Sequence, residues 1–373
     1  MTKCVPALCA VAVLALLAFA GPSAARPFTP GQRAAMQQIV DEELAKQGAP
    51  GVLAGVWVPG GGRFVAAEGL SNRAAGTAMR RPDHFRIASI TKTFIATAVL
   101  QLVDRGKVRL SDPISRFVDW PGGRRITVRQ LLNQTSGIYN FVEDPVFERR
   151  FDADPTLPWT APADGLDIAR GRDPYFRPGK GFHYSETNYY LAGMIVEKVT
   201  GTPIERVLRR RILRPLGLRE TSFPSTPALP APFTRGYLEE NGVLRDVTAS
   251  NPKVSWTAGA MISTLDDLRV WARALATGRP LLKRRTQRAR LPKVTIEKEP
   301  ITVKYGLGMF SINDFLGHNG AIFGYSTTML YLPKTGATII TFMNKASNES
   351  DESGEAAILL AKLLYPKRFP GLP

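Results

Sequence analysis

Cysteine and histidine are both scarce in this chain of 373 residues. The only cysteines are Cys4 and Cys9, so the chain beyond them can form no disulfide bond and has no thiol nucleophile. The histidines are His84, His183 and His318, and none belongs to an HExxH or similar pair. Because protein zinc sites are built mainly from cysteine and histidine, a catalytic zinc site is not expected. We predict neither a metal ion nor a cofactor.

Long apolar runs are also lacking, except from Ala7 to Ala20. Lys3 precedes this run and the small residues Ser23-Ala24-Ala25 follow it, which is the pattern of a secretory signal peptide. The run is shorter than the ~20 apolar residues that cross a bilayer, so a membrane anchor is the weaker interpretation. We therefore predict that residues 1–25 are a signal peptide, that the mature chain is periplasmic or secreted, and that it has no transmembrane span.

Acidic residues are few relative to basic ones, with 32 Asp and Glu against 49 Lys and Arg, and the net charge is +17. The basic residues are spread along the chain, with local clusters at 209–211 and 283–285. An exported protein rarely meets nucleic acid, so we expect no nucleic-acid partner. Attraction to an anionic cell envelope is the more natural consequence of this charge.

Apolar periodicity places strands near both ends of the chain and helices between them. We expect strands at 51–58, 63–70, 305–312, 326–332 and 337–343, turns at 317–324 and 333–336, and helices at 30–47, 90–105, 127–134, 188–199, 202–213, 265–276 and 355–364. This order predicts an α+β fold, an antiparallel β-sheet flanked by helices with an inserted mostly helical region. The sheet region comprises residues 26–88 plus 254–373, the helical region 89–253, and together they form one catalytic unit, 26–373.

The string Ser89-Ile90-Thr91-Lys92 opens the helix expected at 90–105. Serine needs a neighbouring base to become a nucleophile, and a lysine three residues later lies on the same helix face. The free backbone amides of a helix N-terminus can also stabilise an oxyanion. A second S-x-x-K string, at 250–253, contains Pro252, which would break the helix that must align the pair. We interpret this second string as a chance match. Alone, Ser89 could be an ordinary helix cap.

Two further motifs support a catalytic role for the Ser89–Lys92 string. Tyr184-Ser185-Glu186 follows the turn at 178–181, and Gly317-His318-Asn319-Gly320 opens the late strand region. Together with Ser89 and Lys92, they resemble the three motifs of the serine β-lactamase and penicillin-binding family. The resemblance is to the branch of class C β-lactamases, D-alanyl-D-alanine carboxypeptidases and family VIII esterases. It covers nearly all of the chain after residue 25.

The resemblance implies a role for each motif residue. Ser89 attacks an acyl carbonyl, and Lys92 and Tyr184 move its proton, through a tyrosinate or a neutral lysine. The backbone amides of Ser89 and Ala321 form the oxyanion hole. His318 stands where a lysine is common and is expected to hydrogen-bond the tyrosine or the substrate. The expected substrate contacts are Glu186, Asn319, Gly320, Tyr139 and Asn140.

The sequence departs from the family pattern at Glu186, where asparagine is usual, and at His318. It also contains a decoy, Lys334-Thr335-Gly336, which spells the third motif of many penicillin-binding relatives. This string follows Pro333 between two expected strands, so we predict that it is a hairpin turn.

The resulting hypothesis is an exported serine hydrolase that acts through a Ser89 acyl-enzyme on a small-molecule or peptide substrate with an ester or amide bond. D,D-peptidase, esterase and β-lactamase activity remain open within it. The alternative is a penicillin-recognising or envelope-binding module with the same fold and little turnover.

Overall fold

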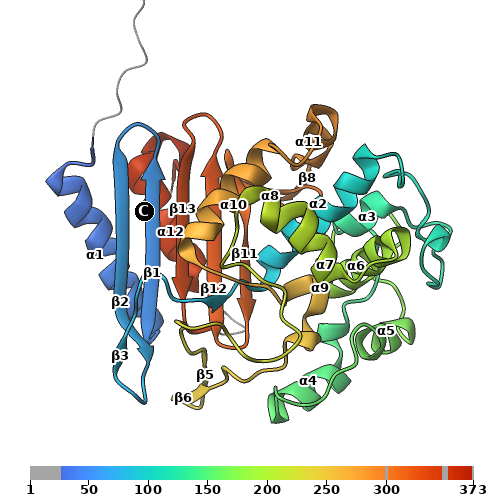
Figure 1. Cartoon of the computed structure of the whole chain (residues 1–373), viewed down its shortest axis with the longest axis horizontal. Coiled ribbons are helices and arrows are strands. Elements are labelled where there is room, and N and C mark those ends of the chain that lie inside the picture. The colour runs from blue at the N-terminus through green and yellow to red at the C-terminus, as the bar shows by residue number, and fades with distance from the viewer. Residues whose placement is uncertain (1–26, 299–300, 347–351, 372–373) are drawn as a thin grey trace, which may run out of the picture.

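The computed structural model describes residues 27–298, 301–346 and 352–371 (Figure 1). The predicted signal peptide, residues 1–25, lies outside them. Nine strands form one antiparallel sheet in the order β3-β2-β1-β13-β12-β11-β10-β9-β8. Their bounds are β1 Gly51–Val58, β2 Gly62–Asn72, β3 Thr77–Ala78, β8 Val294–Glu297, β9 Val303–Tyr305, β10 Phe310–Ile312, β11 Phe315–Ile322, β12 Tyr325–Leu332 and β13 Ala337–Met343. Two small ladders pair β4 Phe85–Arg86 with β7 Ile262–Ser263, and β5 Tyr237–Glu240 with β6 Val243–Asp246.

Strands from the two ends of the chain meet at the centre of this sheet, as the sequence led us to expect. Strand β1 pairs with β13 from Val52 opposite Met343 to Trp57 opposite Thr338. On its other side β1 pairs with β2 in the hairpin. The sheet can therefore form only when residues almost 300 positions apart have come together.

Helices cover both faces of the sheet and build the inserted region. The α-helices are α1 Pro30–Gln47, α2 Thr91–Asp104, α3 Val128–Leu132, α4 Pro145–Ala153, α5 Ala163–Arg170, α6 Glu186–Thr200, α7 Ile204–Leu208, α8 Arg214–Leu216, α9 Trp256–Gly259, α10 Leu265–Thr277, α11 Arg284–Arg290 and α12 Glu352–Leu364. Short 3-10 helices are η1 Ala88–Ile90, η2 Ile114–Arg116, η3 Phe141–Glu143, η5 Pro252–Val254 and η6 Pro366–Arg368, and η4 Arg209–Leu213 is a π-helix. None of the helices in the described residues is long and apolar enough to cross a membrane.

Alternation along the central strands sends apolar side chains to two cores. On β1, Val52 and Val56 face the core beneath α1 and α12, whereas Leu53 and Trp57 face the larger core. The larger core lies between the sheet and the helical region, and α10 packs on this face of β11, β12 and β13. Ile87 and Ile90, which flank Ser89, belong to this larger core.

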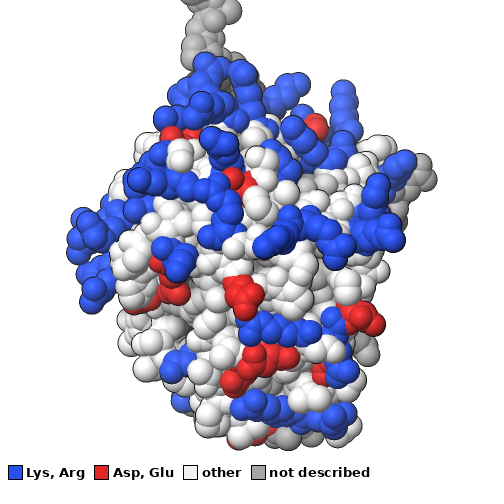
Figure 2. All heavy atoms as spheres, turned by 90° about the vertical axis from the view of Figure 1, so that its right-hand side faces the viewer, with Lys and Arg blue, Asp and Glu red and all other residues white. Residues whose placement is uncertain are grey.

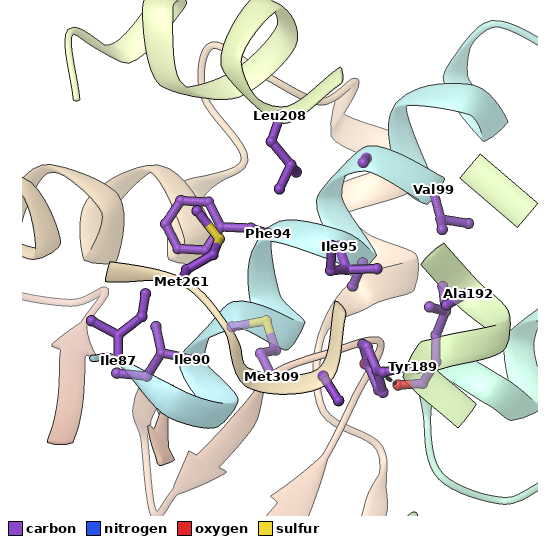
Figure 3. Packing of buried hydrophobic residues seen from close by; sticks show 14 of the residues in the cluster. Ile87, Ile90, Phe94, Ile95, Val99, Tyr189, Ala192, Leu208, Met261 and Met309 are labelled. Carbon is purple, nitrogen blue, oxygen red and sulfur yellow. Dashed lines mark hydrogen bonds between the residues drawn. The ribbon is translucent and has the colours of Figure 1, made fainter. Parts of the chain in front are cut away.

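Helix α2 is buried through most of its length at the centre of the larger core (Figure 3). Phe94 stacks on Trp271 of α10 with ring centroids 3.8 Å apart, and Ile95 and Val99 are fully buried. Tyr189 and Ala192 of α6 lie on another side of α2. A helix surrounded in this way holds the residues at its N-terminus in fixed positions.

Two expectations about the late strands were wrong. Only residues 323–324 of the turn expected at 317–324 form a turn, because 317–322 belong to β11, which pairs with β12. Glycine and asparagine made this segment resemble a turn. The strand expected at 305–312 is two strands, β9 and β10, separated by a turn in which Gly308 has φ +70°. The turn expected at 333–336 is present between β12 and β13.

Candidate active site

Ser89 and Lys92 are placed by the junction between η1 and α2. Ser89 lies within η1, and Lys92 is the second residue of α2. Ile87 and Ile90 on either side of the serine are fully buried and anchor the junction. Ala88 has φ +45°, a conformation that costs a residue with a Cβ of order 1–3 kcal/mol and is concentrated at functional sites.

Lys92 is completely buried, and its side-chain nitrogen makes three hydrogen bonds. Nζ lies 2.9 Å from Ser89 Oγ, 2.6 Å from Glu186 Oε2 and 2.9 Å from the Ala258 carbonyl oxygen. The structure thus brings Ser89 and Lys92 together, as the spacing predicted. Burial lowers the pKa of Lys92, and the negative charge of Glu186 acts against this decrease.

Tyr184 lies beside Lys92, with the lysine nitrogen 4.8 Å from the centre of its ring. Its hydroxyl oxygen is buried and makes no hydrogen bond within the described part of the chain. Burial raises the pKa of Tyr184 well above its usual value, and the charge of Glu186 raises it further, whereas proximity to Ser89 acts in the opposite direction. The raised pKa favours the neutral phenol, so of the two expected bases, a tyrosinate or a neutral lysine, it supports the lysine. A neutral phenol can donate a proton but is a poor base.

The loop at residues 133–138 hydrogen-bonds to the tyrosine motif, which we define as residues 184–186, and to the start of α6. The side-chain oxygen of Gln134 accepts hydrogen bonds from the Ser185 amide and from Asn188 Nδ2. Asn188 Oδ1 in turn accepts a bond from the Ser136 hydroxyl. These groups are buried, so they fix the start of α6 and with it Tyr184 and Glu186.

His318 lies on β11 and is 1% exposed. Its Nδ1 donates to the Asn319 carbonyl oxygen at 2.6 Å, and its Nε2 accepts from the Tyr305 hydroxyl at 2.9 Å. Burial lowers the pKa of His318 to about 3, so the ring is neutral. We expected a hydrogen bond with Tyr184 or the substrate, but both nitrogens are occupied, and Tyr184 meets the ring only at a centroid distance of 6.3 Å.

The far end of β11 lies against the nucleophile. A Cβ added at Gly320 would be 2.6 Å from the Ser89 backbone nitrogen, so only glycine allows the strand to approach so closely. Within the described residues, β10 pairs only with 315–317 of β11, so the edge beyond is left without a partner strand. Ala321 is exposed on this edge, and Asn319 is half-buried.

A cavity of about 1320 Å³ opens in front of Ser89. Ser89, Glu186 and Ala321 are among its lining residues, together with aromatic side chains of α4 and of the β11–β12 turn. Phe151 of α4 stacks on Phe323 of the turn at a centroid distance of 6.0 Å. The β5–β6 hairpin and residues 254–259 add to the lining, which also includes residues 46–47, 141–142, 155, 345–346 and 352. The cleft can therefore hold an apolar group next to the serine.

Tyr139 and Asn140 do not line this cavity. Asn140 is buried, its Oδ1 accepts from the Glu186 amide at 3.0 Å and its Nδ2 donates to Glu143 at 2.8 Å. The Tyr139 ring stacks on Tyr175. The Tyr139 carbonyl oxygen accepts from the Ser185 and Thr187 hydroxyls. Both residues therefore support the tyrosine motif, and neither lines the cavity, which corrects their expected contact with substrate.

The two decoy strings lie apart from the cleft residues. Ser250 is buried, and its hydroxyl donates to the Val247 carbonyl oxygen rather than contacting a lysine. Lys334 is exposed in the turn between β12 and β13, as we predicted. No group of three metal-binding side chains is found in the part of the chain that the structure describes.

Two participants were missed by the sequence analysis. The Ala258 carbonyl oxygen leaves no trace in sequence because any residue could supply it. The Tyr305 hydroxyl, which hydrogen-bonds His318, belongs to the string Tyr305-Gly306-Leu307-Gly308 before β10. Its position just ahead of the third motif was the only available signal.

A buried Ser–Lys pair at the start of a helix, beside the edge of an antiparallel sheet, defines the class of β-lactamase-fold serine hydrolases. The family model described as Beta-lactamase matches residues 36–363, and the chain belongs to this family.

Similarity to individual proteins is moderate. Protein flp of Staphylococcus aureus (strain N315) is 26% identical over 329 residues, which are 83% of this chain but only 62% of that protein. Esterase EstB of Burkholderia gladioli is 31% identical over 212 residues, 52% of each chain. A D-stereospecific amidohydrolase from Streptomyces sp. superposes with a TM-score of 0.79 at 34% identity, over 91% of this chain and 99% of that one. These relatives support hydrolase activity for this chain.

Proposed function

We propose that this protein is an exported serine hydrolase that cleaves amides and esters of apolar acyl groups through an acyl-enzyme on Ser89. The observation that carries the proposal is the 2.9 Å contact between Lys92 Nζ and Ser89 Oγ beside a cavity that Ser89 and several aromatic side chains line. The names of the esterase and the amidohydrolase relatives agree with both bond types.

Acylation starts with Lys92 as the base. In its neutral form, which burial favours, the amine takes the hydroxyl proton while Ser89 Oγ bonds to the carbonyl carbon. The oxyanion is held by the backbone amides of Ser89 and Ala321. Tyr184, a neutral phenol, then protonates the departing nitrogen or oxygen as its bond to carbon breaks. Protonated Lys92 returns a proton to the tyrosine.

Deacylation repeats the proton transfer with water. Neutral Lys92 takes a proton from water as the water oxygen bonds to the acyl carbon, and the same proton passes to Ser89 Oγ when it leaves. Glu186 stabilises the protonated form of Lys92 at 2.6 Å. The carboxylate therefore supports the base after it has accepted a proton.

The cavity wall indicates the acyl group. Phe147 and Phe151 are almost fully buried in α4, Phe323 stacks on Phe151, and all three rings line the cavity. We propose an aromatic or large aliphatic acyl side chain at this wall. D-amino acid amides with such side chains are our first choice, in accord with the amidohydrolase relative.

Glu186 disfavours β-lactams. The asparagine usual at this place can donate a hydrogen bond to a substrate amide carbonyl, whereas an ionised carboxylate can only accept. The mispaired contact should cost about 1–3 kcal/mol.

A substrate panel tests the proposal. We expect turnover of D-phenylalanine amide and of a short p-nitrophenyl ester to exceed that of a chromogenic cephalosporin and of a D-alanyl-D-alanine peptide. Glu186→Asn should shift the ratio of activities towards the cephalosporin. Stable acylation without turnover of any substrate would instead identify a penicillin-recognising module, and an N-terminus at Met1 in envelope-fraction protein would contradict export.

A further inference from the structure

Basic side chains gather on one face of the molecule without acidic partners. We call this set the cationic cap; it consists of Arg105, Lys107, Arg109, Arg129, Arg209, Arg210, Arg211, Arg214, Arg279, Lys283, Arg284, Arg285 and Arg288. All are exposed except Arg211, which is half-buried. Figure 2 shows Lys and Arg dominating the upper part of this face, with most of the acidic residues lower down.

The cap is continuous, although its residues come from four parts of the chain. Helix α11 begins against the end of α2, where Asp104 accepts bonds from the Lys283 amide and the Thr286 hydroxyl. Gln101 of α2 donates to the Arg211 carbonyl oxygen of η4, and the Arg129 amide of α3 donates to Leu110. The ends of these helices thus converge on one surface.

None of the cap cations forms an ion pair with an Asp or Glu side chain in the described residues. Elsewhere exposed arginines do find partners, as Arg116 does in Asp112 and Arg170 in Asp167. The pKa of Arg211 is lowered by burial and then by the charges of Arg105 and Arg210, so the cations repel one another. Such repulsion is relieved when anions bind.

The cap lies away from the cleft. Figure 1 places α11 at one end of the molecule and α4, β5 and β6, which line the cavity, at the other. Neither of the two cavities described for this protein is lined by a cap residue. A linear polyanion is best held in a groove, whereas cations spread over several helix ends suit a broad array of anionic groups. Arginine, which dominates the cap, binds phosphate oxygens in a bidentate manner.

We propose that the cationic cap docks the protein on the surface of an anionic phospholipid bilayer, with the catalytic cleft directed away from the membrane. Each cap cation meets phosphate groups of the lipid headgroups, and binding is peripheral and electrostatic. A single basic residue near an anionic leaflet raises partitioning about five-fold, so several together give stable association at low salt. The docking does not depend on the reaction, and Ser89→Ala should bind as well as the unmodified protein.

Vesicle sedimentation tests the proposal. The exported protein should bind vesicles of phosphatidylcholine and phosphatidylglycerol in equal parts, should not bind phosphatidylcholine alone, and should be released at ~1 M salt, where the Debye length falls to about 3 Å. The variant Arg284→Glu/Arg285→Glu/Arg288→Glu should bind at least ~100-fold more weakly, because three attractive charges become repulsive.

The matched control variant changes the net charge by the same amount as the cap variant, but at the opposite end of the molecule. Arg73, Arg149 and Lys253 are exposed residues outside the cap, near β3, in α4 and in η5, and Arg73→Glu/Arg149→Glu/Lys253→Glu should retain binding within a few-fold. Equal loss in both variants would mean that net charge rather than the cap governs binding. Binding to soluble poly(glycerol phosphate) but not to vesicles, or equal binding to neutral vesicles, would also overturn the proposal.

Discussion

Lys92 Nζ and Glu186 Oε2 lie 2.6 Å apart, in a pair whose lysine is completely buried and whose glutamate side chain is 19% exposed. The pair sets two influences on the lysine against each other: burial favours the neutral amine and the carboxylate favours the ammonium. Burial has the larger effect, so Lys92 can act as the base.

Glu186→Gln should therefore change the pH dependence of catalysis in a defined direction. Removing the negative charge lowers the pKa of Lys92 further, so the neutral amine forms at lower pH. The acidic limb of the kcat/KM profile should shift to lower pH relative to the unmodified enzyme. Glu148→Gln, which changes a carboxylate on the cavity wall that has no ion pair with Lys92, should leave the limb in place. A shift to higher pH in Glu186→Gln would assign the limb to another group.

His318→Ala should lower kcat/KM by about 100-fold, the usual effect of losing a positioned polar group. The histidine accepts a hydrogen bond from the Tyr305 hydroxyl, and its ring lies near the Tyr184 ring. Removing the imidazole therefore frees both tyrosines to move. Lys334→Ala, in the exposed turn, should have almost no effect. Steady-state kinetics of the two variants measure both effects. A larger loss of kcat/KM in Lys334→Ala than in His318→Ala would make the Lys334-Thr335-Gly336 string the functional third motif.

His318 should also make folding stability depend on pH. Its pKa is about 3 in the folded protein and ~6.5 in the unfolded chain, so the unfolded state binds more protons as pH falls below 6.5. This residue's contribution is present above pH 6.5 and should decrease by about 2 kcal/mol between pH 7 and pH 5. Urea unfolding of the enzyme and of His318→Gln at pH 7 and pH 5 measures this change in the free energy of unfolding. The variant should lose less stability on acidification, and identical losses would contradict the low pKa.

Much of the fold and the motif set could be predicted from sequence, because both depend on local patterns. Short, mostly apolar runs located β1, β12 and β13, which are buried on both faces, and the spacing of Ser89 and Lys92 on one helix face needed no tertiary information. The third motif was distinguished from the Lys334-Thr335-Gly336 string by its order relative to the last hairpin, and the structure places Gly320 against Ser89 and Lys334 in an exposed turn. Its strand was mistaken for a turn, since glycine in β11 serves a close approach to Ser89 that sequence does not reveal.

The roles within the site could not be predicted, because they depend on burial. The pKa values of Tyr184 and His318 are shifted mainly by loss of water, which only the packed structure shows. Asn140 was expected at the substrate but points to the Glu186 amide and Glu143 instead. Local sequence gives no measure of such distant contacts.

Active-site labelling followed by peptide mapping tests the central claim that Ser89 is the nucleophile. A fluorophosphonate probe should modify the peptide that contains Ser89, and Ser89→Ala should abolish both labelling and turnover, with a loss of several orders of magnitude in rate. Ser250→Ala, at the other S-x-x-K string, should be labelled as fully as the unmodified protein. Labelling that persists in Ser89→Ala, or that disappears in Ser250→Ala, would contradict the account.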